Sequence, residues 1–329
     1  MRSVAALLVA AAGVAVAADG GRLELVTRDV YLMGTRAHLA AFASTRETAR
    51  ATLAAAVDVL ERTEAELSTW RESSAISALN RHPVGTLWHA RPALCRTFEE
   101  IWRWHGATGG AFDPAIGRLL AGWDVHGDGA IPSPDVQRRA AQTSGLSLLT
   151  FDAGACTLRK RGDVAIDVGA WGKGEALDRV QTAIGRGPWL IDLGGQVSVG
   201  GPAPSGGWTI DIAHPRHRDQ AYREVRLTEG SLSTSGGSER DLMVNGVRIP
   251  HHFDPRTGRP ASFDGSVTVW HASGLTADML STALYVMGPD EGLRWAETHR
   301  VAALYLIVSL GTVRGTASSA FKERFGHEW

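Results

Sequence analysis

The sequence predicts an α+β protein in which mixed or antiparallel sheets are flanked by helices. Segments with helical and with strand periodicity are mixed along the chain, and the strict strand–helix alternation of a doubly wound sheet is missing. Of the 329 residues, 44 % are hydrophobic and 21 % are charged, which suits a globular protein with one or two cores. Because no repeat, low-complexity segment or linker interrupts the chain, we expect a single domain over residues 19–329.

The first helix is expected over residues 48–67, after a capping box formed by Ser44 and Glu47. A second helix is expected to begin at Pro92 and to break at the Gly109-Gly110 pair, and a short one follows Ser133-Pro134. Apolar residues at helical spacing predict three more helices, over 172–184, 274–288 and 289–299. Runs rich in β-branched and aromatic residues predict strands over 149–159, 189–199, 208–213, 266–271 and 302–309.

The first 18 residues resemble a secretory signal peptide. A positive charge at Arg2 precedes an apolar run over residues 4–16, and small residues at 15–17 offer a cleavage site. The run is shorter than the roughly 20 residues of a membrane-spanning helix, and no cysteine follows it that could carry a lipid anchor. We therefore expect a soluble, exported, periplasmic mature protein.

The charge content argues against one class of partner, and the cysteine content permits a disulfide. The formal net charge is −1, from 34 basic and 35 acidic residues, and no Lys- or Arg-rich arm is present, so we expect no nucleic-acid partner. Export permits a disulfide between the two cysteines, Cys95 and Cys156, but two isolated core thiols fit the sequence as well. Both alternatives stay open at this point.

The predicted helix over 274–288 contains two polar residues among core residues. Asp278 and Thr282 are four positions apart, so they lie on one face, one turn from each other. A buried carboxylate is costly unless something pairs with it. This face is therefore a candidate ligand site.

Several familiar catalytic motifs are absent. DVGAWGKG (167–174) lacks the spacing of a phosphate-binding P-loop, and LGGQVSVGG (193–201) does not fit the dinucleotide fingerprint Gly-x-Gly-x-x-Gly. The chain has no Gly-x-Ser-x-Gly elbow and no His-Glu-x-x-His pair. Hydrolase and zinc-protease functions based on those motifs are excluded.

Four polar, glycine-rich segments remain, each with a structural alternative. Lys173, at a helix start, would suit a phosphate or be a surface lysine. Asp113-Pro114 and the predicted loop 232–237 would cradle a ligand or form plain turns. His251 and His252 would supply a base or be structural, and as neighbours in a strand they would point to opposite faces, so that only one faces a site.

Eight stretches together resemble a known family, the ApbE-type FAD:protein FMN transferases, also called flavin transferases. They occur in the family's order across almost the whole mature chain: LMGTRA (32–37), LSTWRESSAISALN (67–80), TGGAFDPAIGRLLAGW (108–123), DVGAWGKGEALD (167–178), IDLGGQVSVGG (191–201), LSTSGGSER (232–240), HHFDPRTGRPA (251–261) and GLTADMLSTALYVMG (274–288). The resemblance implies the ApbE-like flavin transferase fold. It also implies Mg²⁺-dependent transfer of FMN from FAD to a threonine hydroxyl of a target flavoprotein, with a phosphoester formed and AMP released.

The resemblance also implies roles for particular residues. Asp278 and Thr282 would bind Mg²⁺ through their side chains and Ala170 through its carbonyl, while His251 would help to activate the acceptor hydroxyl. The residues implied in FAD binding are Met33, Trp70, Ala111, Phe112, Asp113, Asp167, Lys173 and Phe253. The implied partner is an exported flavoprotein with an acceptor threonine, which would be part of an electron-transfer complex; whether the chain is a monomer or a homodimer stays open.

The sequence departs from the family pattern at several positions. Trp70 replaces a smaller aromatic residue, Glu175 a tyrosine and Gln196 an aspartate. His252 and Phe253 replace aliphatic residues, and Ser281 stands where some members carry another carboxylate. Two alternative functions remain: the first because the same site could use water in place of the threonine, the second because of these departures. One is an FAD pyrophosphatase that gives FMN and AMP, and the other is a non-catalytic periplasmic flavin-binding protein.

Overall fold

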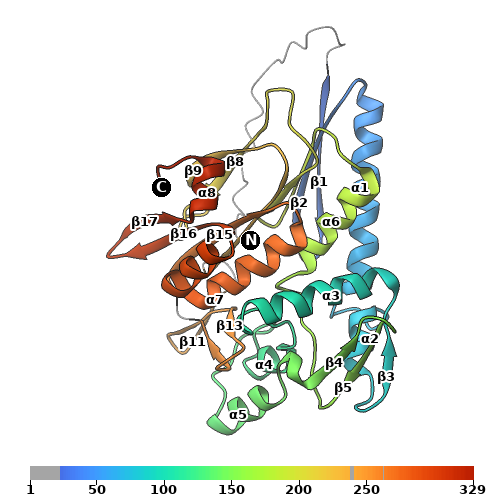
Figure 1. Cartoon of the computed structure of the whole chain (residues 1–329), viewed down its shortest axis with the longest axis vertical. Coiled ribbons are helices and arrows are strands. Elements are labelled where there is room, and N and C mark those ends of the chain that lie inside the picture. Colours follow the sequence, from blue (N-terminus) through green and yellow to red (C-terminus); the bar gives the residue numbers. More distant parts are fainter. Residues whose placement is uncertain (1–22, 238–240, 262) are drawn as a thin grey trace.

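The computed structural model describes residues 23–237, 241–261 and 263–329, and the expected signal peptide, residues 1–18, lies outside them. Its centre is an eight-stranded antiparallel sheet with the strand order β1-β2-β6-β7-β10-β15-β16-β17 (Figure 1). These strands are Glu24–Leu32 (β1), Thr35–Ala43 (β2), Trp189–Leu193 (β6), Gln196–Val199 (β7), Gly230–Gly236 (β10), Gly265–His271 (β15), Ala302–Ser309 (β16) and Thr312–Ala317 (β17).

Helices and short hairpins surround this sheet, which confirms the α+β class. The helices are Arg46–Leu67 (α1), Ala75–Arg81 (α2), Pro92–Ala107 (α3), Gly117–Gly122 (α4), Pro134–Gln142 (α5), Gly172–Ile184 (α6), Gly274–Thr298 (α7), Ser319–Phe325 (α8) and the 3₁₀ turn Leu146–Leu148 (η1). The outer strands are Leu87–His89 (β3), Leu149–Asp152 (β4), Thr157–Lys160 (β5), Trp208–Ala213 (β8), Ala221–Leu227 (β9), Leu242–Val244 (β11), Val247–Ile249 (β12), Phe253–Asp254 (β13) and Arg259–Pro260 (β14).

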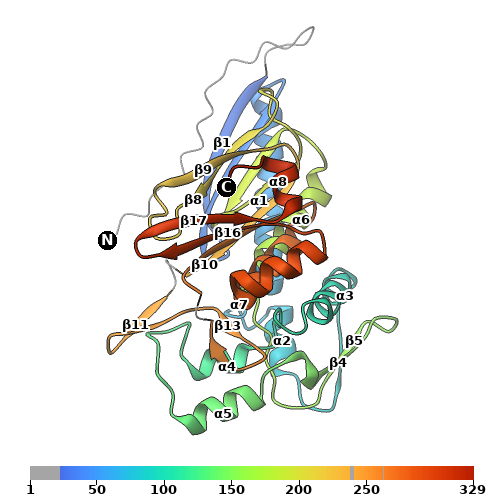
Figure 2. The same cartoon turned by 60° about the vertical axis from the view of Figure 1, so that its left-hand side comes forward.

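The middle strands of the central sheet are buried on both faces, and strand β16 shows why. Successive residues of a strand point to opposite faces. Leu304 and Leu306 belong to a cluster with β8, β9 and α8, whereas Ala303 and Tyr305 pack on the other side with α7. Figure 2 shows β8, β9 and α8 on one side of the sheet and α1, α6 and α7 on the other.

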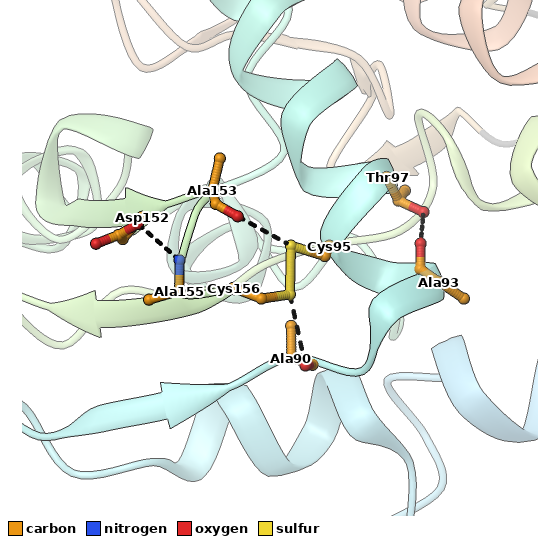
Figure 3. The surroundings of a disulfide bond; sticks show 8 residues. All are labelled: Ala90, Ala93, Cys95, Thr97, Asp152, Ala153, Ala155 and Cys156. Carbon is orange, nitrogen blue, oxygen red and sulfur yellow. Dashed lines mark hydrogen bonds between the residues drawn. A yellow bond between two sulfur atoms is a disulfide. The ribbon is translucent and has the colours of Figure 1, made fainter.

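A second group of elements packs beside and below α7: α2 to α5, the β3–β5–β4 sheet and the hairpins β11–β12 and β13–β14 (Figure 1). A disulfide between Cys95 and Cys156 ties the start of α3 to the β4–β5 turn (Figure 3), with the two Cα atoms 5.5 Å apart. The alternative of two isolated thiols is therefore wrong. None of the helices among the described residues has the length and apolar character to cross a membrane.

Several sequence predictions need correction. Thr45, not Ser44, caps α1, because its side chain accepts the backbone N–H of Thr48. The expected strand 149–159 is the hairpin β4–β5, and the expected strand 189–199 is the hairpin β6–β7. In the second hairpin Gly194 and Gly195 form the turn with φ values of 62° and 86°, which glycine tolerates. Apolar residues precede and follow this turn, so the sequence resembles one continuous strand.

Two further differences bear on the site. The expected loop 232–237 is mostly strand β10, paired with β7 and β15. The expected helices 274–288 and 289–299 follow one another without a loop, and the change of direction lies at Gly288, whose φ is 73°. The expectations for α3, α5, α6, β8 and β16 agree with the structure to within a few residues.

Candidate functional site

A cavity of about 510 Å³ lies between the end of the central sheet and the elements below α7. This volume is within the usual range of small-molecule sites, about 300–1,000 Å³. Its walls come from the β1–β2 turn, β2, the ends of β6 and β10, α4, the N-terminal parts of α6 and α7, and several loops, among them those at residues 111–116, 125–126 and 167–170. Nine of the predicted site residues line it: Ala111, Asp113, Asp167, Ala170, Lys173, His251, Phe253, Asp278 and Thr282.

Asp278 is the most buried carboxylate of the cavity, with 3 % of the residue exposed. Its Oδ1 and Oδ2 lie 3.3 and 3.4 Å from Nζ of Lys173. Its Oδ2 also accepts the backbone N–H of Gly174 at 3.0 Å, and its Oδ1 accepts the hydroxyl of Ser233 at 3.3 Å. These donors compensate for the burial of the charge.

Gly174 makes this arrangement sterically feasible. A Cβ atom there would lie 2.3 Å from the carbonyl oxygen of Gly274, so only glycine lets the first turns of α6 and α7 approach this closely. The first turn of α6 therefore directs the backbone N–H of Gly174 and the side chain of Lys173 toward the carboxylate on α7. The positive end of a helix dipole, with a lysine beside it, favours an anion.

A cluster of serines supports Asp278 from the sheet. Ser281 is fully buried, and its hydroxyl lies 3.1 and 3.0 Å from those of Ser233 and Ser235 on β10, while donating to the carbonyl of Asp278 at 3.0 Å. Neither β10 serine was predicted as a site residue, because their segment was expected to be a loop. Their alternation with Leu232 and Thr234 was the available signal for a strand with one polar face.

Two carboxylates of the cavity wall organise loops. Asp113 accepts the backbone N–H groups of Ala115 and Leu146, each at 2.8 Å, and lies 3.2 Å from Nε2 of His105. Asp167 accepts the backbone N–H of Gly169 at 2.7 Å and lies 3.2 Å from Nε2 of His126. Both side chains line the cavity, but much of their hydrogen-bonding capacity is already used within the protein.

Three predicted FAD-binding residues lie away from the cavity wall. Phe112 is fully buried in the hydrophobic core, so its side chain shapes the wall only from behind. Met33 precedes the lining residue Gly34 in the β1–β2 turn. Trp70 is 74 % exposed, and its ring lies 5.7 Å from that of His126, which does line the cavity.

Both adjacent histidines line the cavity, so the expectation that only one can face it was wrong. His251 and His252 precede strand β13 instead of lying within a strand, and their ring centroids are 4.0 Å apart. Nδ1 of His251 lies 3.0 Å from Oδ1 of Asp241. The imidazole is thus held by a carboxylate that no sequence motif indicated.

The opposite wall was not predicted at all. It consists of Arg36 and His38 on β2, Asp192 on β6, and Arg218. Burial raises the pKa of Asp192, although the N–H of Gly195 at 2.7 Å and the nearby cations act against this. The alternation of Arg36 and His38 in an otherwise apolar strand was the available sequence signal.

The family model of the ApbE family matches residues 33–305 of the chain. The chain is 29 % identical over 274 residues to an FAD:protein FMN transferase of Vibrio cholerae, covering 80 % of this chain and 81 % of that protein. It is 31 % identical over 277 residues to an FAD:protein FMN transferase of Klebsiella pneumoniae, covering 80 % and 78 %.

Solved structures show the same architecture. The ApbE protein of Thermotoga maritima superposes with a TM-score of 0.84 at 28 % identity, covering 93 % of this chain and all of that one. The flavin transferase ApbE of Vibrio cholerae superposes with a TM-score of 0.80 at 26 % identity, covering 92 % of this chain and all of that one. The predicted ApbE-like fold is confirmed.

Proposed function

Because the chain belongs to the ApbE family, we propose that it is an FAD:protein FMN transferase that moves FMN from FAD to a threonine hydroxyl of a target protein and releases AMP. The observation that carries the proposal is the single cavity in which nine predicted site residues meet, with the buried Asp278–Lys173 pair on one side and His251 among the lining residues. The cavity's volume of about 510 Å³ suits a dinucleotide whose remaining atoms extend to the open side.

The proposed reaction is one phosphoryl-type transfer. The acceptor Oγ attacks the phosphorus of the FMN half of FAD and forms a new P–O bond. The bond from that phosphorus to the bridging oxygen breaks, and its electron pair leaves with AMP. His251 takes the proton of the hydroxyl, so that the attacking oxygen carries its electron pair into the new bond.

Phosphate binding falls to the start of α6. Lys173 supplies a point charge, and the positive end of the α6 helix dipole would favour a pyrophosphate beside it. Both would stabilise the negative charge that builds up on the leaving phosphate. The exposed ring of Trp70, beside His126, and the ring of Phe253 are the aromatic surfaces proposed to contact the flavin.

Mg²⁺ fits the oxygen donors at the start of α7. The carboxylate of Asp278, the hydroxyl of Thr282 and the carbonyl of Ala170 belong to residues that line one cavity, and all three are the hard donors that Mg²⁺ prefers. Among the described residues no three His, Cys, Asp or Glu side chains group together as a metal site, so the substrate's phosphates would complete the ligand shell. When bound, Mg²⁺ would supply positive charge to the pyrophosphate.

We further propose that the mature protein is one exported, periplasmic domain and that its acceptor is another exported protein. The leader-like residues 1–18 support this location. A protein encoded beside this chain's gene, with an exported domain and an acceptor threonine, is the first candidate to test.

The experiment separates transfer from hydrolysis. The purified protein is incubated with FAD and MgCl₂, with and without the candidate acceptor, and AMP, FMN and acceptor mass are measured. Transfer predicts AMP in amounts equal to FMN-modified acceptor. Free FMN and AMP without acceptor would indicate a pyrophosphatase, and no product in either arm, despite FAD binding, would indicate a flavin-binding protein.

A further inference from the structure

We propose that Asp241 is a positioning residue that holds the His251 imidazole in the tautomer and orientation needed to accept the proton of the acceptor hydroxyl. The inference rests on the proposed function for its catalytic consequence. It extends that function because neither the motifs nor the family resemblance pointed to residue 241. The structural part, a fixed histidine tautomer, is testable without any turnover.

The hairpin β11–β12 explains why these two residues meet. Asn245 and Gly246 form its turn with φ values of 51° and 78°, as the common two-residue hairpin turns require. The turn sets the register Leu242↔Ile249. Asp241 directly precedes one strand, and His251 follows the other by two residues, so the base of the hairpin brings them together.

The contacts at this base fix the carboxylate as well as the imidazole. Oδ1 of Asp241 lies 3.0 Å from Nδ1 of His251 and accepts the backbone N–H of the same residue at 3.2 Å. Oδ2 accepts Nε of Arg248 at 2.5 Å, and Arg248 also donates to the carbonyl of Gly237 at 2.9 Å. The Asp241 side chain is only 7 % exposed, so water competes little for these bonds.

An ionised carboxylate accepts hydrogen bonds but donates none. Beside Asp241, neutral His251 therefore carries its proton on Nδ1, which leaves Nε2 as the basic atom. During transfer, Nε2 would take the hydroxyl proton while the new P–O bond forms and AMP leaves. The resulting imidazolium would then stand beside the negative charge of Asp241, which stabilises it.

The surrounding charges agree with an ionised Asp241. Burial raises its pKa, but the hydrogen bonds from His251 and Arg248 outweigh burial and leave the pKa below its usual value. Three more titratable groups lie around the pair. The ring of His252 is 4.0 Å from that of His251, and burial raises the pKa of Tyr285 to about 12. Asp264 attracts the charge of Arg248 electrostatically from a distance. None of these contacts replaces the carboxylate at Nδ1 of His251.

The experiment uses Asp241→Asn in the full-length mature protein, with Asp264→Asn as the matched control. Both variants remove one carboxylate near Arg248, but Asp264 pairs with Arg216, and among the described residues it makes no hydrogen bond or ion pair with His251. We expect kcat for FMN transfer to fall about 10- to 100-fold in Asp241→Asn, part of the roughly 10²- to 10⁴-fold that a positioned base contributes. KM for FAD and the thermal midpoint should stay near the wild-type values, and Asp264→Asn should behave as wild type.

The pH dependence gives a second readout. Without the adjacent negative charge, protonation of the imidazole becomes less favourable, so the acid limb of the kcat profile should move to lower pH in Asp241→Asn. Asp241→Glu, which keeps the charge, should recover part of kcat and the original limb. An unchanged profile with unchanged kcat in Asp241→Asn would overturn the proposal.

A spectroscopic measurement separates this inference from the proposed function. ¹⁵N NMR of histidine-labelled protein, with the signal assigned through His251→Gln, should show the Nδ1–H tautomer in the wild type and a loss of that preference in Asp241→Asn. The Nε2–H tautomer in the wild type would refute the inference even if transfer is active. The expected tautomer in a protein without transfer activity would instead refute only the catalytic function.

Discussion

Gly174 lies where the first turns of α6 and α7 touch, and replacing it with alanine tests how the site is assembled. The new Cβ would lie 2.3 Å from the carbonyl oxygen of Gly274 and 2.7 Å from Cα of Leu275. Both are backbone atoms that no side-chain rotation can move away. The two helices must therefore separate, which strains the bond of 3.0 Å from the Gly174 N–H to Asp278.

Three contributions set the size of the effect. Overpacking of a tight contact costs about 1–3 kcal/mol. Weakening a hydrogen bond to a buried charge costs about 1.5–3 kcal/mol. The higher helix propensity of alanine offsets about 1 kcal/mol of this. Together these contributions lower the expected free energy of unfolding of Gly174→Ala by about 2–4 kcal/mol.

Urea denaturation monitored by circular dichroism measures this change, and Gly106→Ala is the control. Gly106 lies in α3, and a Cβ there would meet nothing within 4 Å, so alanine should be neutral or stabilising by up to about 1 kcal/mol. If Gly174→Ala is as stable as Gly106→Ala, the first turns of α6 and α7 do not need a glycine at their contact, which would contradict this prediction.

Two further changes test the disulfide and the buried wall of the cavity. The double variant Cys95→Ser/Cys156→Ser removes a crosslink between residues 61 positions apart. In non-reducing urea titrations we expect its free energy of unfolding to be about 2–4 kcal/mol lower than that of the oxidised wild type and equal to that of the reduced wild type. Equal stability of the variant and the oxidised wild type would contradict this. Burial raises the folded-state pKa of Asp192 above its unfolded value of 3.8, so this group's contribution to stability decreases as the pH rises from about 3.8 through the raised pKa. Asp192→Asn should therefore gain stability relative to the wild type between pH 4 and pH 8, and a constant difference would show that the carboxylate titrates alike in both states.

The sequence predicted much of the cavity wall formed by α6 and α7, because the residues of this wall lie in local sequence patterns. Asp278 and Thr282 share a face through helical spacing alone, and both line the cavity. Lys173 was recognised as the start of a glycine-rich helix, and its ammonium group does face Asp278. Mg²⁺, FAD and the acceptor came from the family resemblance, since helical spacing names no ligand.

What the sequence did not predict depends on strand register. Ser233 and Ser235 face α7 only because their segment is a central strand, whereas its serines and glycines favour a loop in isolation. Asp241 meets His251 only through the β11–β12 register. Phe112 shows that a matching motif does not establish where a side chain lies. It belongs to one of the matching stretches, yet its side chain is part of the core and not of the cavity wall.

The proposed function requires Asp278 at a site that transfers FMN, and one measurement tests this directly. Wild-type protein and Asp278→Ala, both shown to be folded by circular dichroism, are incubated with FAD, MgCl₂ and the candidate acceptor, and the acceptor is analysed by peptide mass spectrometry. We expect FMN on a threonine with the wild type and at least about a 100-fold lower rate with Asp278→Ala, as expected when electrostatic stabilisation of the transition state is lost. Full transfer by Asp278→Ala would contradict the role assigned to this carboxylate.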